Sequence, residues 1–127
     1  MRELLAAMQM AAANGLLVVE DADTAFRGSL EVGDGPVVAT GDVVLAKVVH
    51  AVDGLVAVSV VESDGETELK GEVFAGEIAL SNGRLRVRDV PGDNVLTVGF
   101  DPGPCRLRIA VDDAAYPQIV EILVPPL

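Results

Sequence analysis

Hydrophobic and polar residues alternate over many short stretches of the chain, and turn-forming residues separate those stretches. In the segment 84–88, for example, Leu85 and Val87 alternate with arginines, which is the period-two pattern of a strand that buries one face. Clusters of Gly, Asp, Asn and Pro follow such stretches about every eight to twelve residues. The pattern predicts a mainly β fold: one domain over residues 15–127, an antiparallel β-sandwich or barrel of about eight strands.

The clearest hairpin signal is Asp53-Gly54, because Asp-Gly suits the two positive-φ positions of a type I′ turn. We expect it to join residues 43–52 to residues 55–62, two strands that are apolar on both faces and therefore central. Thr40-Gly41-Asp42 separates the first of these strands from residues 37–39. Other β-prone stretches cover residues 16–19, 26–32, 68–75, 78–80, 85–87, 95–100, 105–111 and 119–124.

The first 14 residues follow another pattern. Residues 2–13 are nearly all strong helix formers, and Asn14-Gly15 is a good helix stop. The apolar residues of this segment share one stripe at helical spacing: Leu4, Leu5, Met8, Ala11 and Ala12. We therefore expect residues 1–14 to form an N-terminal helix that packs on the sheet or on a partner subunit.

Composition adds that the core is aliphatic, since half of the 127 residues are apolar and only 3% are aromatic. The formal net charge is −11. A field of that sign repels phosphate backbones and attracts basic surfaces. We therefore expect no nucleic-acid partner, and we expect any protein partner to present a basic surface.

The single cysteine, Cys105, excludes an internal disulfide. The N-terminal stretch superficially resembles a secretory leader, but Glu3 and Gln9 interrupt it. No stretch approaches the ~20 apolar residues of a membrane span. These features favour a cytoplasmic location without membrane association.

Side chains with chemical potential are few and isolated. His50 is the only histidine, and spacing does not bring it to Cys105, whose strand phase points inward with Leu107. The acidic pairs lack the ligand cadence of a calcium loop and are expected to form turns and solvated rims: Asp21 with Asp23, Asp112 with Asp113, and Asp101 beside Pro102. No glycine-rich phosphate motif occurs. We predict no catalytic residue, no metal and no cofactor.

The arginines are distributed unevenly. Five of the nine basic residues occupy two predicted strands, where they alternate with apolar residues and so project from one face of each strand: Arg84, Arg86, Arg88, Arg106 and Arg108. If the strands are neighbours, these side chains form a candidate binding face for carboxylate or phosphate. The alternative is that their stems cover apolar surface and that acidic neighbours neutralise them.

The stretch from Leu96 to Asp112, LTVGFDPGPCRLRIAVD, resembles a pattern of small actinobacterial β-sandwich proteins. In that pattern a strand ends at Pro-Gly and an Arg-x-Arg strand follows. Residues 77–80 and 83–87 resemble the preceding strands of the same group. Some of its members are similar to competence-J-type inhibitors of a DNA-entry nuclease. The resemblance covers roughly the last 50 residues, implies a β-sandwich of inhibitor type, and carries over no functional residue.

Three functions follow as hypotheses. The first is a non-enzymatic, acidic protein-interaction module of inhibitor or immunity type. The second is a β-domain that binds a small molecule carrying a carboxylate or phosphate. The third is a structural subunit that forms a homo-oligomer through its N-terminal segment and its edge strands.

Overall fold

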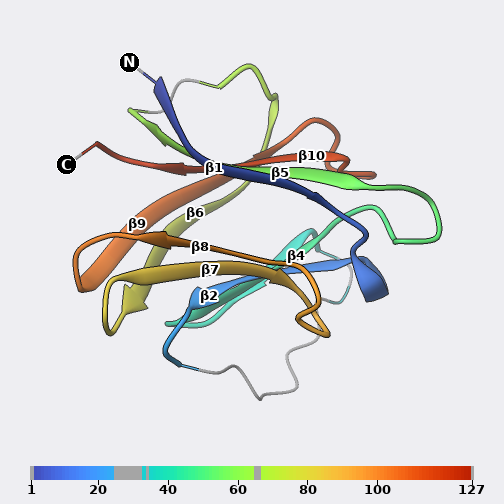
Figure 1. Cartoon of the computed structure of the whole chain (residues 1–127). Coiled ribbons are helices and arrows are strands. Elements are labelled where there is room, and N and C mark those ends of the chain that lie inside the picture. Colours follow the sequence, from blue (N-terminus) through green and yellow to red (C-terminus); the bar gives the residue numbers. More distant parts are fainter. Residues whose placement is uncertain (1, 25–32, 34, 65–66, 127) are drawn as a thin grey trace.

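Two five-stranded sheets packed face to face make up the computed structural model, which describes residues 2–24, 33, 35–64 and 67–126 (Figure 1). Sheet A has the order β1-β5-β10-β9-β6, with bounds β1 Arg2–Met10, β5 Val56–Ser63, β10 Ile119–Val124, β9 Gly103–Val111 and β6 Gly71–Leu80. Sheet B has the order β3-β4-β2-β7-β8, with bounds β3 Val37–Ala39, β4 Val43–Lys47, β2 Leu16–Asp21, β7 Arg84–Asp89 and β8 Val95–Gly99.

The mainly β, sandwich prediction is confirmed, and the two separate sheets replace the barrel alternative. The described residues form ten strands rather than about eight. Every neighbouring pair is antiparallel except β5 and β10, which run parallel and are joined by a long connection that includes β6 to β9. The expected stretches 68–75 and 78–80 merge into one strand, β6, which begins only at Gly71, whereas the expected strand over residues 26–32 lies outside the described residues.

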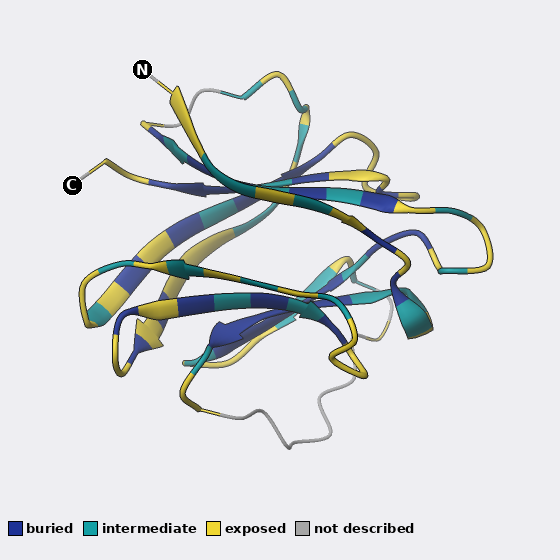
Figure 2. Ribbon diagram, in the orientation of Figure 1, coloured by how far each residue is buried: buried dark blue, intermediate teal, exposed yellow. Residues whose placement is uncertain are grey.

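The core lies between the sheets and is built from aliphatic side chains, as the composition predicts. Alternate residues of each strand turn inward, for example Leu85 and Val87 on β7 and Leu107 and Ile109 on β9. Figure 2 shows this alternation as stripes of buried and exposed residues along the strands. A smaller cluster of Val61, Ala110 and Leu123 is buried on the outer face of sheet A, where Leu69 packs over it.

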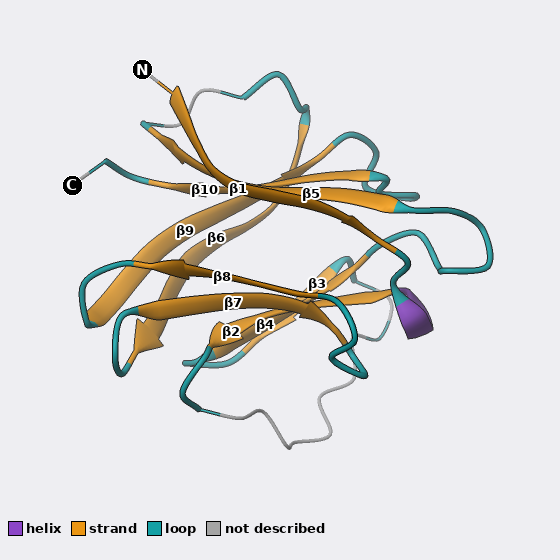
Figure 3. Ribbon diagram, viewed as in Figure 1, coloured by secondary structure: helices purple, strands orange, loops and turns teal. Residues whose placement is uncertain are grey.

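The predicted N-terminal helix is wrong: residues 2–10 are β1, an edge strand of sheet A paired with β5. No α-helix occurs in the described residues, and Ala13–Gly15 make only a short 3-10 turn, η1 (Figure 3). A bulge between Leu4 and Ala6 shifts the phase of the strand, so that Leu5 and Met8 both pack on the core. Their spacing of three imitates a helical stripe, and sheet pairing overrides the weak preference of the backbone for helix.

The predicted hairpin at Asp53-Gly54 is also wrong. β4 belongs to sheet B and β5 to sheet A, so residues 48–55 cross between the sheets. Gly54 has φ +151°, but Asp53 is not among the positive-φ residues, and a type I′ turn needs both. The positive-φ pair is instead Asn14 and Gly15, at φ 64° and 63°, which turn the chain from β1 into β2.

Candidate functional site

The five arginines of the expected binding face do not lie on one face. Arg84, Arg86 and Arg88 are on β7 in sheet B, whereas Arg106 and Arg108 are on β9 in sheet A. The inward partners of both strands meet in the core, so the two arginine sets point outward from opposite sides of the sandwich. A continuous arginine face requires that the two strands be neighbours, and they are not.

On sheet B the arginines are neutralised by neighbouring acids. Glu20 on β2 is fully buried and receives Arg86 and Arg88, with Nε to Oε2 distances of 2.7 Å for both. Arg84 pairs with Asp23; this contact lowers the pKa of Asp23 and raises that of Arg84. These contacts match the structural interpretation of the arginines, in which acidic neighbours compensate them.

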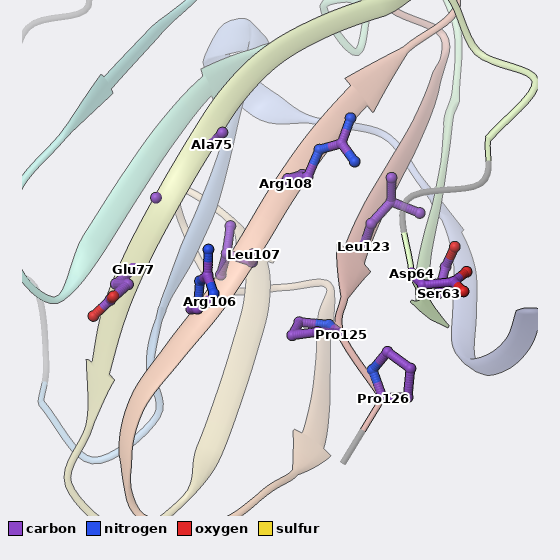
Figure 4. Close-up of a pocket in the computed structure, with 11 residues that line it drawn as sticks. Ser63, Asp64, Ala75, Glu77, Arg106, Leu107, Arg108, Leu123, Pro125 and Pro126 are labelled. Atoms are coloured by element: carbon purple, nitrogen blue, oxygen red, sulfur yellow. The ribbon is translucent and has the colours of Figure 1, made fainter.

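On sheet A the two arginines differ. Arg108 pairs with Glu72 across the β9–β6 ladder. Arg106 lies opposite Glu77 in the register, yet within the described residues its guanidinium makes no ion pair or hydrogen bond. Figure 4 shows the Glu77 side chain pointing away from the guanidinium of Arg106.

A groove of about 510 Å³ contains both of these arginines on the outer face of sheet A (Figure 4). β9 and β6 form one side of it, and the end of β10 with the following prolines forms the other. Its lining includes Arg106, Arg108, Leu123, Pro125 and Pro126, together with Ser63 and Asp64 at the end of β5. Glu77 also lines it, so the groove combines apolar, cationic and anionic side chains.

A second surface lies at the end opposite the termini, where two segments pass between the sheets beside two turns that each stay within one sheet (Figure 1). We name this surface the crossover end; it comprises residues 11–15, 48–55, 90–95 and 112–119. Backbone hydrogen bonds hold three of these segments together: Val49 N–H donates to Pro117 O at 2.8 Å, and Ala51 N–H donates to Ala12 O at 3.1 Å.

The crossover end collects exposed apolar side chains. Among the described residues, all the large apolar side chains that are exposed lie there except Leu4: Val52, Leu55, Val90, Val95, Tyr116 and Ile119. Val52 is the most exposed, at 83%. Single exposed apolar residues are normal on a protein surface, whereas several of them grouped at one end are typical of an interaction surface.

Carboxylates surround these apolar residues. The four segments contain Asp53, Asp93, Asp112 and Asp113, all exposed, and their sequences include no Lys or Arg. Asp112 accepts hydrogen bonds from the N–H groups of Gln118 and Ile119 at 3.0 and 3.1 Å, which fixes the loop shape. The expectation that Asp112 and Asp113 form turns is confirmed, since Asp113 likewise accepts from Ala115 N–H.

Cys105 and His50, the two isolated side chains of the sequence analysis, have contacts that suit a structural role. Cys105 is buried in the core, as its strand phase predicts, and burial raises the pKa of its thiol. His50 lies in the crossing segment rather than in a strand, and its Nδ1 accepts a hydrogen bond from Val52 N–H. The described part of the chain contains no cluster of three or more His, Cys, Asp or Glu side chains placed to hold a metal ion. Within the same residues, no helix is both long enough and apolar enough to cross a bilayer.

Sequence reasoning missed the crossover end because its residues come from four separate segments. The sequence pattern instead places Val52 and Leu55 at the ends of two predicted strands. A usable signal was nonetheless present: large apolar residues beside Asp in turn segments without Lys or Arg.

No protein-family model matches the chain, and no curated protein matches it. Two solved structures are similar to it over nearly their whole lengths. One is ComJ from Bacillus subtilis, described as an inhibitor of the DNA degrading activity of NucA, with a TM-score of 0.76, 7% identity, and coverage of 100% of this chain and 99% of that chain. The other is described as crocagin biosynthetic gene J, with a TM-score of 0.65, 19% identity, and coverage of 99% and 98%.

These similarities show the fold: the chain has a ComJ-like β-sandwich. The resemblance to competence-J-type proteins is thereby confirmed at the level of fold. The structural similarity extends over nearly the whole chain rather than over roughly the last 50 residues alone. The actinobacterial origin stays a prediction.

Proposed function

We propose that this chain is a non-enzymatic, acidic protein-interaction module of inhibitor or immunity type, and that the crossover end binds a basic protein partner. The observation that carries the proposal is the concentration of exposed apolar side chains and carboxylates, without Lys or Arg, in the four segments of that end. Protein interfaces combine an apolar centre with a polar rim, and tyrosine is enriched among their energetically important residues.

Charge supports the same partner. Five arginines are neutralised by carboxylates within the fold: Arg2, Arg84, Arg86, Arg88 and Arg108. With a net charge of −11, the excess of carboxylates is left for the surface. A surface of this kind accelerates association with a basic partner and makes binding sensitive to salt.

The fold likeness supports the class of function. ComJ, which shares this fold over its full length, is described as a nuclease inhibitor. Nucleases present basic surfaces to nucleic acid, and carboxylates on an inhibitor can occupy such surfaces in place of phosphates. The partner of the present chain is therefore proposed to be a protein with a basic surface of the kind that binds nucleic acid.

The experiment compares three tagged proteins as baits in a lysate of the source organism, at low and at high salt. The wild type should retain a protein that high salt releases. The variant Val52→Ser/Leu55→Ser should lose it, whereas Leu4→Ser, which alters an exposed apolar residue outside the crossover end, should retain it. Retention by both variants, or equal loss from both, would refute the assignment of the surface.

A charge-matched pair tests the acidic rim separately. Asp53→Asn/Asp93→Asn removes two carboxylates from the crossover end, and Asp101→Asn/Glu68→Gln removes two exposed carboxylates from other places. We expect the first to slow association with the captured protein by about tenfold at low salt and the second to have a smaller effect. An equal effect would assign the attraction to net charge alone.

Self-association through β1 is a second candidate function, favoured by one observation. β1 is an edge strand of nine residues, and after Glu3 it carries no charge, so its edge lacks the charges that usually prevent strand pairing. Size-exclusion chromatography with light scattering should then show a dimer for the wild type and a monomer for Ala6→Lys. A monomeric wild type would remove this candidate.

A further inference from the structure

The groove on the outer face of sheet A presents one guanidinium that the fold leaves uncompensated. The other described arginines are all ion-paired with carboxylates. Arg106 is exposed at the groove, and Glu77, its neighbour in the register, points away from it (Figure 4). A guanidinium with free N–H groups on a fixed strand is the usual partner of a planar, two-oxygen anion.

The surroundings of Arg106 indicate what an anionic group bound there would be attached to. Pro125 and Pro126 form an exposed apolar wall, and Leu123 extends that apolar surface into the sheet. A volume of about 510 Å³ is within the range of sites for small molecules or for two or three residues of a peptide. The groove therefore suits a ligand in which an anionic group lies a few bonds from an apolar group.

Electrostatics favour a carboxylate over a phosphate. The body of the protein carries a net charge of −11, so each additional negative charge on a ligand is opposed by the whole molecule. Arg108 is committed to Glu72, which leaves a single guanidinium to compensate the ligand. One positive group suits one negative charge, and a phosphate carries more than one near neutral pH.

We propose that the groove is a binding site for a carboxylate joined to an apolar group, with Arg106 holding the carboxylate and Pro125 and Pro126 contacting the apolar part. Such a group occurs in free organic acids and in acidic side chains that neighbour apolar residues in a peptide. The site is at the other end of the sandwich from the crossover end, so it is independent of the proposed partner surface.

The test uses NMR titration of the full chain with hexanoate, with a capped peptide that contains one Glu between leucines, with hexanamide and with inorganic phosphate. Hexanoate or the peptide should shift the amide signals of Arg106, Arg108 and Leu123 in a saturable manner, with a dissociation constant below about 10 mM. Saturation by hexanoate alone identifies a free acid as the ligand, and tighter binding of the peptide identifies a protein segment. Hexanamide should produce no saturable shift.

Arg106→Gln should weaken binding at least about tenfold, because it removes a charge-assisted pair of hydrogen bonds. Arg84→Gln is the matched control, since it removes one exposed guanidinium from the other sheet and should leave binding unchanged. Unaltered thermal unfolding of Arg106→Gln shows that the variant is folded. The absence of saturable shifts, equal binding by Arg106→Gln, or phosphate binding as tight as that of hexanoate would overturn the proposal.

Discussion

Ser81 donates two hydrogen bonds to one oxygen of Asp21: its backbone N–H lies 3.0 Å from Oδ2 and its hydroxyl 2.8 Å. Asp21 ends β2 in sheet B and Ser81 follows β6 in sheet A, so this contact fastens one sheet to the other. Thr24 and Asp23 donate to the same carboxylate. Burial by itself raises the pKa of Asp21, but these hydrogen bonds outweigh it and lower the pKa from 3.8 to about 2.

Asp21→Asn should therefore destabilise the protein at neutral pH, by about 1–3 kcal/mol, because an amide nitrogen then faces donors that need an acceptor. Urea unfolding at pH 7 measures the difference. Asp101→Asn, an exposed substitution with the same change of charge, should change the free energy of unfolding by less than about 0.5 kcal/mol. Equal values for the two variants would contradict the role of Asp21.

The same contact predicts how stability depends on pH. The pKa of Asp21 is lower in the folded than in the unfolded chain, so its contribution is complete above about pH 4 and declines as the pH falls toward 2. The loss amounts to roughly 2 kcal/mol. Asp21→Asn should lack this component, so that the curves of wild type and variant converge in acid.

Loss of the Glu20 carboxylate alone is predicted to destabilise the fold strongly, whereas replacing Glu20 together with Arg86 and Arg88 is predicted to cost little stability. Glu20→Gln should lower the free energy of unfolding by about 3 kcal/mol, because it leaves two guanidinium groups without their anion. The value lies at the lower limit for buried pairs since the side chains of Arg86 and Arg88 keep 27% and 14% exposure. Urea unfolding gives the measurement.

The control replaces the whole group. Glu20→Leu/Arg86→Leu/Arg88→Leu should recover stability to within about 1 kcal/mol of wild type, since apolar packing often substitutes for a buried ion pair. A triple variant less stable than Glu20→Gln would show that the ion pairs stabilise the fold beyond mutual compensation.

Gly83 is predicted to tolerate no side chain. Its φ is +74°, and a β-carbon there would lie 2.2 Å from the carbonyl oxygen of Phe100. Gly83→Ala should cost more than about 4 kcal/mol or prevent folding. Gly92→Ala separates the two causes, because Gly92 has φ +79° with no neighbour within 4 Å; it should cost only about 1 kcal/mol. Thermal unfolding distinguishes the variants, and a mild Gly83→Ala would be the contrary result.

Several strands could be predicted from the sequence because their signal is local. The bounds of β10 match the prediction, and β7 shows the expected alternation of Leu85 and Val87 with arginines. The N-terminal strand could not be predicted in this way. Its residues favour helix locally, and only pairing with the distant β5 makes them extended.

A substitution on β1 distinguishes the local preference for helix from the effect of pairing with β5. Ala7 is exposed and lies opposite Ser59 in the ladder, so Ala7→Val should raise the free energy of unfolding by up to about 0.5 kcal/mol. In a helix the same change would lower stability. Ala11→Val, outside the strand, should have almost no effect.

The candidate sites could be predicted only in part, because they too depend on contacts between residues that are distant in the sequence. Arginines that alternate with apolar residues were correctly placed on outward faces, but which strands are neighbours depends on long-range pairing. Arg86 and Arg106 consequently lie in different sheets. The crossover end is likewise assembled from distant turns, as the bond from Val49 N–H to Pro117 O illustrates.

The position of β10 has a consequence for how the protein is made. β10 lies between β5 and β9 in sheet A, so the pairing of Ile119 with Ala57 must await the last strand of the sheet to leave the ribosome. Sheet A is incomplete until β10 pairs with β5 and β9, and contacts this remote in sequence form slowly, roughly in milliseconds to seconds. Until then one edge of β5 lacks its neighbouring strand, and an unpaired apolar strand edge is a place where aggregation can begin.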